Sequence, residues 1–100
     1  MPYRLSALAE QDLEEIWSYV AEDASPATAD RLIDAIIARF ERLAAQPRMG
    51  RLRPEFGEGV RSFAVESYVI YYHAEDVLIA RILHGRRDQA AAWSDHPGGH

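Results

Sequence analysis

Two amino-acid types are missing from this sequence. It has no cysteine, which excludes a disulfide scaffold, a thiolate metal site and a cysteine nucleophile. It also has no lysine, so all 11 basic side chains are arginine and no lysine Schiff base, phosphate-loop lysine or lysine general base exists. Two explanations of the all-arginine set stay open, a composition bias and a use for the planar, bidentate guanidinium group.

Long apolar stretches are also missing. No run approaches the ~20 residues that span a membrane. Glu10, Asp12, Glu14 and Glu15 interrupt the first twenty residues, where a secretory signal would need an unbroken apolar core. We therefore expect a protein of the cytoplasm that has no membrane partner, and the lack of cysteine fits this compartment.

Histidines are few, and their positions do not suit a metal site. The four are His73, His84, His96 and His100. Only His96 and His100 have a spacing that metal ligands use on a helix, four residues, but they lie in a Pro/Gly tail that is unlike a helix. We expect neither a metal nor a cofactor.

The composition is that of one soluble globular domain. The chain has 100 residues, of which 48% are hydrophobic and 27% charged. We assign residues 1–100 to a single domain, with a frayed Pro/Gly tail over about 94–100. The net charge of −5 argues against a general nucleic-acid coat, so we expect no direct sequence-specific DNA binding.

Two helical stripes of apolar residues occupy the first half of the chain, and a serine N-cap precedes each. The first stripe predicts a helix over about residues 7–22. Pro26 suits the first position of a second helix, and Pro47 predicts its end near Ala45. The short connection predicts an antiparallel helical hairpin. We interpret the acids of the first helix, Glu10, Asp12, Glu14 and Glu15, as a solvated face rather than as catalytic carboxylates.

The second half reads as strands after a loop over residues 47–60. Alternating stretches at 61–66, 68–73 and 77–84 have short connections, which predict an antiparallel meander. Tyr3–Leu5 is a short first strand that joins the sheet. The predicted fold is therefore α+β: a short N-terminal strand, then an antiparallel helical hairpin packed on a small antiparallel β-sheet.

Two features of the strands suggest function. Strand parity places Tyr68 and Tyr72 on one face and Tyr71 on the other, where an exposed ring could stack on a base or a partner side chain. The apolar strand at 77–84 ends in His84, Gly85, Arg86, Arg87 and Asp88, and loops after strands often carry function. The alternative is a structural histidine followed by a weak surface ion pair.

Six segments in order, over Tyr3 to about Asp88, resemble the ParE branch of the RelE/ParE superfamily, the toxins of type II toxin–antitoxin systems. The segments are Tyr3-Arg4-Leu5-Ser6; Ala9 with Asp12-Leu13-Glu14-Glu15-Ile16-Trp17; Gln46-Pro47-Arg48-Met49-Gly50; Gly59-Val60-Arg61; Tyr68-Val69-Ile70-Tyr71-Tyr72; and Ile82-Leu83-His84-Gly85-Arg86-Arg87-Asp88. The resemblance implies a helical hairpin on a small antiparallel sheet, which agrees with the pattern of the sequence.

The superfamily holds two activities. RelE-like members are ribosome-dependent endoribonucleases with lysines and arginines around the sheet. This sequence departs from them, because Val69 follows Tyr68 where they have arginine and Trp93 stands in the tail where they have tyrosine. The ParE resemblance instead implies inhibition of DNA gyrase by binding, without catalytic residues, and neutralisation by a ParD-like antitoxin.

The resemblance and the positions of residues together give two sets of candidates. The candidates for target binding and toxicity are Arg61, Tyr71, His84, Arg86, Arg87, Asp88 and Trp93. The candidates for antitoxin docking are Leu13, Trp17, Val20, Ile33, Ile37 and Phe40. Two alternatives stay open: a RelE-like nuclease with Arg61 and Arg86 on phosphate and His84 as acid or base, and an inactive module that only binds the antitoxin.

Overall fold

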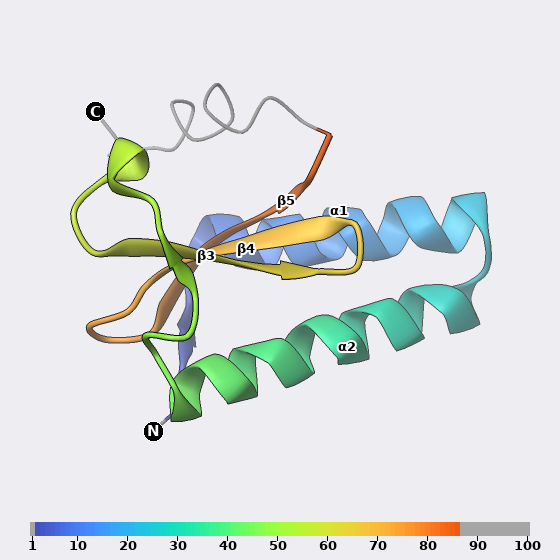
Figure 1. The fold of residues 1–100 in the computed structure, drawn as a ribbon. Coiled ribbons are helices and arrows are strands. Elements are labelled where there is room, and N and C mark those ends of the chain that lie inside the picture. Colours follow the sequence, from blue (N-terminus) through green and yellow to red (C-terminus); the bar gives the residue numbers. More distant parts are fainter. Residues whose placement is uncertain (1, 87–100) are drawn as a thin grey trace.

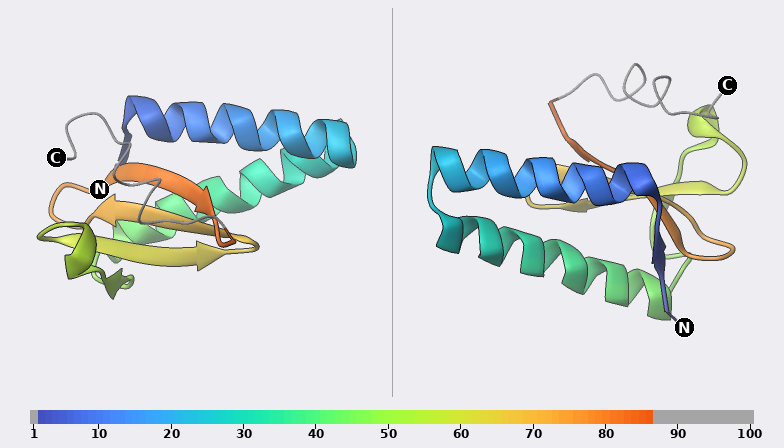
Figure 2. Two further views of the ribbon diagram at one scale, coloured as in Figure 1. Left: turned by 90° about the horizontal axis from the view of Figure 1, so that it is seen from above. Right: turned by 180° about the vertical axis from the view of Figure 1, so that it is seen from behind.

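Two helices cover one face of a five-stranded sheet (Figure 1), in a computed structural model that describes residues 2–86. Seen from behind, both helices lie in front of the strands (Figure 2). The elements are β1 (Arg4–Leu5), α1 (Ala7–Asp23), α2 (Pro26–Ala45), β2 (Arg51–Leu52), the 3-10 helix η1 (Pro54–Phe56), β3 (Val60–Val65), β4 (Tyr68–His73) and β5 (Leu78–His84).

The two predicted helices are confirmed, and serine side chains start both. The Ser6 hydroxyl accepts a hydrogen bond from the Ala9 amide at 3.0 Å, and that of Ser25 accepts one from Thr28 at 3.1 Å. These caps satisfy amides that have no partner within the helix. The first helix runs one residue beyond its predicted end, to Asp23.

The sheet has the order β1-β5-β4-β3-β2. The predicted α+β class and the meander β3-β4-β5 are confirmed. The sheet is mixed rather than wholly antiparallel, because β1 pairs in parallel with β5. The Arg4 amide donates to Val77 and the Ser6 amide donates to Ile79, both at 3.0 Å, so the chain enters α1 directly from the sheet.

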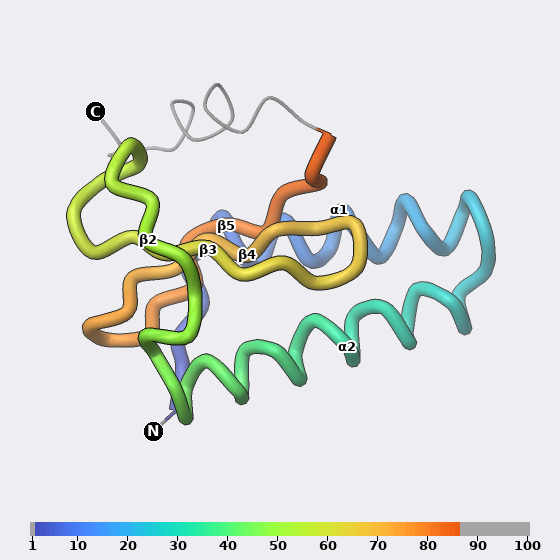
Figure 3. The backbone as a smooth tube through the Cα atoms, viewed as in Figure 1, coloured from blue at the N-terminus to red at the C-terminus, as the bar shows by residue number. Residues whose placement is uncertain are grey.

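The prediction that residues 47–60 are only loop is wrong. This segment contains β2, which pairs with β3, and the 3-10 helix η1. Figure 3 shows the chain leaving α2, passing through β2 and curling back into β3. A two-residue strand is too short to produce an alternating pattern, so the sequence carried no signal for β2.

The core lies between the helices and the sheet. Its members include Ile36, Phe40, Ile70 and Tyr72, each with 0% exposure. A smaller cluster on the other side of the sheet joins Val60, Tyr71 and Leu83 to Phe56 and Val69. Tyr68 and Tyr72 belong to the first cluster and Tyr71 to the second, which confirms the predicted strand parity.

Candidate functional site

The end of β5 is bound to the turn between β3 and β4. His84 pairs in register with Tyr68, and the two rings meet edge to face with centroids 5.2 Å apart. The Gly85 amide donates a hydrogen bond to the Ser67 carbonyl at 2.8 Å. These contacts place His84 and the exposed Arg86 at the end of β5, beside the β3–β4 turn.

A main-chain contact sets the tautomer of His84. Its Nδ1 accepts a hydrogen bond from the Arg86 amide at 3.0 Å. A ring nitrogen that accepts a hydrogen bond carries no proton, so the neutral ring is protonated on Nε2. The same hydrogen bond fixes the backbone of Arg86 relative to the His84 ring.

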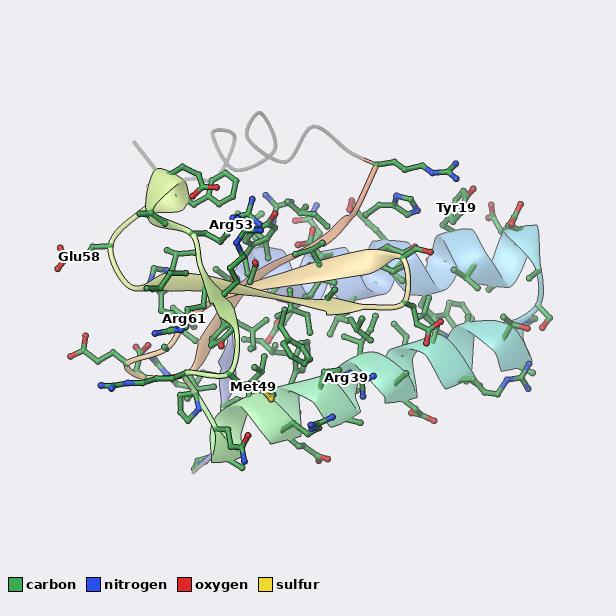
Figure 4. All side chains as sticks on the ribbon, viewed as in Figure 1. Tyr19, Arg39, Met49, Arg53, Glu58 and Arg61 are labelled. Carbon is green, nitrogen blue, oxygen red and sulfur yellow. The ribbon has the colours of Figure 1, made fainter. Side chains whose placement is uncertain are left out.

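Two cavities meet at these rings. One, of about 430 Å³, lies between α1 and β5 and is lined by Glu15, Tyr19, Tyr68, His84 and Arg86 among others. The other, of about 450 Å³, shares Tyr19, Tyr68 and His84 and continues towards α2. Figure 4 shows Tyr19 on α1, where 64% of its surface is exposed. We call this hollow, centred on Tyr19, Tyr68 and His84, the strand-end groove.

Burial also defines the chemistry of Tyr68, the aromatic floor of the groove. Desolvation raises the pKa of its hydroxyl above the usual value, and Tyr19 adds to the rise. The phenol is therefore neutral at physiological pH and can both donate and accept a hydrogen bond. The strand-end groove thus offers aromatic surface, a histidine and an arginine to a ligand or partner.

A buried ion pair supports the wall of the groove. Arg81 donates to both carboxylate oxygens of Asp12, from Nε at 2.9 Å and from Nη2 at 3.0 Å. The Ile82 amide also donates to this carboxylate at 2.9 Å. Both charged side chains are buried, so the assignment of Asp12 to a solvated face is wrong. Helical spacing could not reveal a partner that lies 69 residues away in the chain.

Arg61 does not join the strand-end groove. It pairs with Tyr72, whereas His84 pairs with Tyr68 at the other end of β4. A strand rises ~3.3 Å per residue, so these positions are separated by ~13 Å along the sheet. The predicted grouping of Arg61 with His84 and Arg86 on one surface is therefore wrong.

Arg61 instead holds the segment that follows α2. Its Nη1 donates to the Gly50 carbonyl at 2.7 Å and to the Arg48 carbonyl at 3.1 Å. Tyr72 holds the same segment, because its hydroxyl accepts from the Gly50 amide at 2.9 Å and donates to the Pro47 carbonyl at 2.8 Å. We call this arrangement the loop clamp. It gives a structural role to Arg61 and Gly50.

Tyr71 is not exposed. Only 1% of its surface is accessible, and the Phe56 ring packs on it edge to face at 5.1 Å. The guanidinium of Arg53 lies 5.8 Å from the Tyr71 ring and 5.3 Å from the Phe56 ring. The 3-10 helix therefore covers the face that the sequence left open, and the Tyr71 ring cannot stack on a partner.

The predicted antitoxin-docking residues on the helical hairpin divide by exposure. Phe40 is fully buried and packs on Tyr3, so it cannot contact a partner. Trp17 is 38% exposed, and its Nε1 donates to Asp30 at 2.8 Å. The others are partly buried against the core: Leu13, Val20, Ile33 and Ile37. The remaining target-binding candidates, Arg87, Asp88 and Trp93, lie outside the described residues.

Residues 2–86 contain neither a cluster of metal ligands nor a membrane-spanning helix. Within residues 2–86, no three side chains of histidine, aspartate or glutamate gather in a way that could hold a metal ion. No helix in the same part of the chain is both long enough and apolar enough to cross a membrane.

Comparison with known proteins identifies the class. The fold matches a solved structure titled "Chromosomal ParDE TA system from P. aeruginosa", with a TM-score of 0.72 and 22% identity over 84% of this chain and 95% of that chain. Residues 3–89 match the family described as "ParE toxin of type II toxin-antitoxin system, parDE". The chain therefore belongs to the ParE toxin family, as the sequence motifs predicted.

Individual relatives carry two kinds of name. The chain is 38% identical to Toxin ParE3 of Caulobacter vibrioides over 82 residues, covering 80% of this chain and 82% of the relative. It is 36% identical to Toxin RelE3 of the same organism over 83 residues, covering 80% and 89%. Both names refer to toxins.

Proposed function

We propose that this protein is a toxin that binds DNA gyrase and blocks its supercoiling activity, and that a ParD-like antitoxin neutralises it. Membership of the ParE toxin family supports this proposal. The protein acts as a binding inhibitor and needs no cofactor. The strand-end groove, with His84 and Arg86 at its rim, is the surface that meets the target.

The position of Arg61 is the observation that favours binding over catalysis. A nuclease of the RelE kind would need arginines around one phosphate, to stabilise the charge that develops as the RNA 2′-hydroxyl attacks. Here Arg61 and Arg86 lie at opposite ends of β4, and Arg61 is engaged in the loop clamp. These two side chains cannot hold the same phosphate in this structure.

The RelE-like reading remains the second candidate because one relative bears the name Toxin RelE3. In that reading His84 would be the acid or base, and Arg86 alone among the described candidates would bind phosphate. The third candidate is an inactive module that only binds the antitoxin.

One comparison separates the three candidates. The purified protein is added to a gyrase supercoiling assay and, in parallel, to ribosomes translating an mRNA. Inhibited supercoiling with intact mRNA supports the proposal, whereas cleaved mRNA with normal supercoiling replaces it with the nuclease. Neither effect, together with tight antitoxin binding, identifies the inactive module.

Variants then test the groove. His84→Ala and Arg86→Ala should each weaken inhibition at least tenfold, because they remove groups from its rim. Arg4→Ala is the control, since Arg4 is also exposed but contacts Asp76 elsewhere in the sheet. Equal losses in all three variants would contradict the assignment of the groove.

A further inference from the structure

Two consecutive backbone amides hold the chain where it leaves β5. The Gly85 amide donates to the Ser67 carbonyl at 2.8 Å, which extends the pairing of β5 with β4 by one residue. The Arg86 amide donates to Nδ1 of His84 at 3.0 Å. This second acceptor belongs to a side chain two residues earlier, as in an Asx turn. His84 thus supplies the acceptor that asparagine or aspartate usually supplies at such a turn.

The His84 ring links the exposed end of the chain to the sheet. The ring is partly buried and meets the Tyr68 ring edge to face, with centroids 5.2 Å apart. Arg86 is exposed and lines the same cavity as His84. Because the ring is held against β4, its hydrogen bond gives the backbone of Arg86 a fixed position. That position determines where the guanidinium of Arg86 lies at the rim of the strand-end groove.

Only the neutral form of the His84 ring can make this contact. Imidazole side chains change their charge between about pH 5 and 8. The imidazolium form carries a proton on both nitrogens, so neither can accept a hydrogen bond. A protonated Nδ1 would point its N–H at the N–H of Arg86. Protonation of His84 therefore breaks the hydrogen bond and releases the backbone of Arg86.

We propose that His84 is a positioning residue: its neutral ring fixes the backbone of Arg86 for the encounter with gyrase, and protonation of the ring weakens binding. This inference rests on the proposed function. A segment that is ordered before binding loses less conformational entropy in the complex, so the hydrogen bond strengthens binding. His84 contributes mainly through Arg86, whose guanidinium contacts the target.

Other titratable and charged groups face the His84 ring from the elements packed around it. They are Asp12, Glu15 and Tyr19 of α1, Arg31 of α2, Glu66 of the β3–β4 turn, Tyr68 of β4 and Arg86 itself. A substitution at position 84 leaves all of these groups in place, and it leaves the groups of gyrase unchanged. The difference in pH dependence between the wild type and such a variant therefore reports on the imidazole.

Two amide side chains form a matched pair of variants. In His84→Asn the side-chain oxygen is bonded to Cγ, as Nδ1 is in histidine, so it can accept from the Arg86 amide at any pH. In His84→Gln the amide lies one carbon further out and matches Nε2 instead. His84→Gln should weaken gyrase binding about tenfold near pH 7.5, and His84→Asn less than about threefold, because only the asparagine keeps the turn ordered. Both variants lose the ring contact with Tyr68, so this loss cancels in the comparison.

The pH dependence of gyrase binding gives a second measurement. The affinity of the full wild-type chain for purified gyrase should fall about tenfold more than that of His84→Asn between about pH 8 and 5.5. In the free protein, the amide NMR signal of Arg86 should shift over the same pH range in the wild type and stay nearly constant in His84→Asn. Circular dichroism checks that every variant is folded at each pH.

The outcomes separate this role of His84 from the proposed function. If the wild-type chain does not bind gyrase, the proposed function fails and the positioning role fails with it. If the wild type binds and His84→Asn is weakened as much as His84→Gln, the positioning role fails while the proposed function stands. The same holds if the wild type and His84→Asn have the same pH profile. If His84→Gln binds well and His84→Asn does not, Nε2 contacts the target directly, which also overturns the positioning role.

Discussion

Strand β4 carries a tyrosine near each end, and the two rings have different surroundings. The Tyr72 hydroxyl makes its hydrogen bonds inside the protein, because it accepts one from Gly50 and donates one to Pro47 in the loop clamp. Tyr68 instead forms the floor of the strand-end groove, beside His84 and the exposed Arg86. The groove end therefore presents an exposed arginine and a partly exposed histidine at the surface, whereas the polar groups at the clamp end bond to the segment that follows α2.

The segments that resemble the family therefore contain residues of two kinds, those with internal contacts and those that line the groove. Gly50 and Arg61 belong to family-like segments, yet their contacts in the structure are internal. His84 and Arg86 also belong to such a segment, but they line a cavity. We expect changes at the clamp end, and at the buried Asp12–Arg81 ion pair behind the groove, to reduce stability, and changes at the exposed residues of the groove end to reduce activity. Four predictions test this comparison.

The largest effect on stability is expected beside the groove, from Asp12→Ala. Removing one partner of a buried ion pair costs about 3–5 kcal/mol of unfolding free energy, since a buried charge loses its counter-charge. Urea unfolding measures the loss. The double variant Asp12→Leu with Arg81→Met should be more stable than the single variant, and a double variant that is less stable would contradict this explanation.

Gly50→Ala should cause the next largest loss, at the clamp end. A Cβ atom at this position would lie 2.5 Å from the Tyr72 hydroxyl and 2.7 Å from the Ser62 carbonyl oxygen. Because the second contact is with backbone, relief requires movement of the sheet, at a cost of about 1–3 kcal/mol. Thermal unfolding measures it. Gly59→Ala is a useful comparison, since its Cβ meets no atom within 4 Å and its cost comes from backbone conformation alone.

Tyr72→Phe should cost about 1–2 kcal/mol by removing two hydrogen bonds. It should also change the alkaline limit of stability. Burial raises the pKa of Tyr68, Tyr71 and Tyr72, so each favours its neutral form more in the folded than in the unfolded state. The contribution of these tyrosines to the free energy of unfolding is complete below about pH 10, and it is lost as the pH rises through their pKa values in the folded state.

The absence of lysine makes this titration easy to read, because tyrosine is then the main side chain that titrates between about pH 9 and 12. Urea unfolding of the wild type and of Tyr72→Phe between about pH 8 and 11.5 measures how steeply the free energy of unfolding falls with pH in each protein. A variant whose stability falls as steeply as that of the wild type above pH 10 would show that Tyr72 does not contribute.

The smallest effect on stability, within about 0.5 kcal/mol, is expected for Arg86→Ala, since Arg86 is exposed. The same variant should show the largest loss of growth inhibition when the protein is induced in bacteria without antitoxin. Arg4→Ala serves again as the control. If Arg86→Ala unfolds at a much lower temperature, the two ends of β4 do not differ as proposed.

Local patterns were sufficient to predict the helices. Serine caps, Pro26 and Pro47 act within a few residues, so both helices were predicted to within one residue at their ends. The strand parity of Tyr68, Tyr71 and Tyr72 also followed from the chain alone. The two-residue strands were harder, because Arg51–Leu52 has no period and the parallel pairing of Arg4–Leu5 depends on where α1 leads.

The candidate site was predicted only in part. His84 and Arg86 were placed correctly at the end of β5, since they follow an apolar strand. Arg61 was misplaced because sequence order does not reveal at which end of the sheet a residue lies. The exposure of Tyr71 was predicted wrongly, because Phe56 of η1 covers its ring and so short a helix has no periodic pattern in the sequence.

By itself, the sequence determined the α+β class, both helices and membership of a toxin family, because caps, periodicity and motifs are local properties of the chain. Tertiary structure alone decided which polar groups remain for a partner. Asp12 and Arg81 pair across 69 residues, and Arg61 is engaged by the loop clamp. Some of the arginines, such as Arg61 and Arg81, therefore make contacts inside the protein, whereas others, such as Arg86, are exposed.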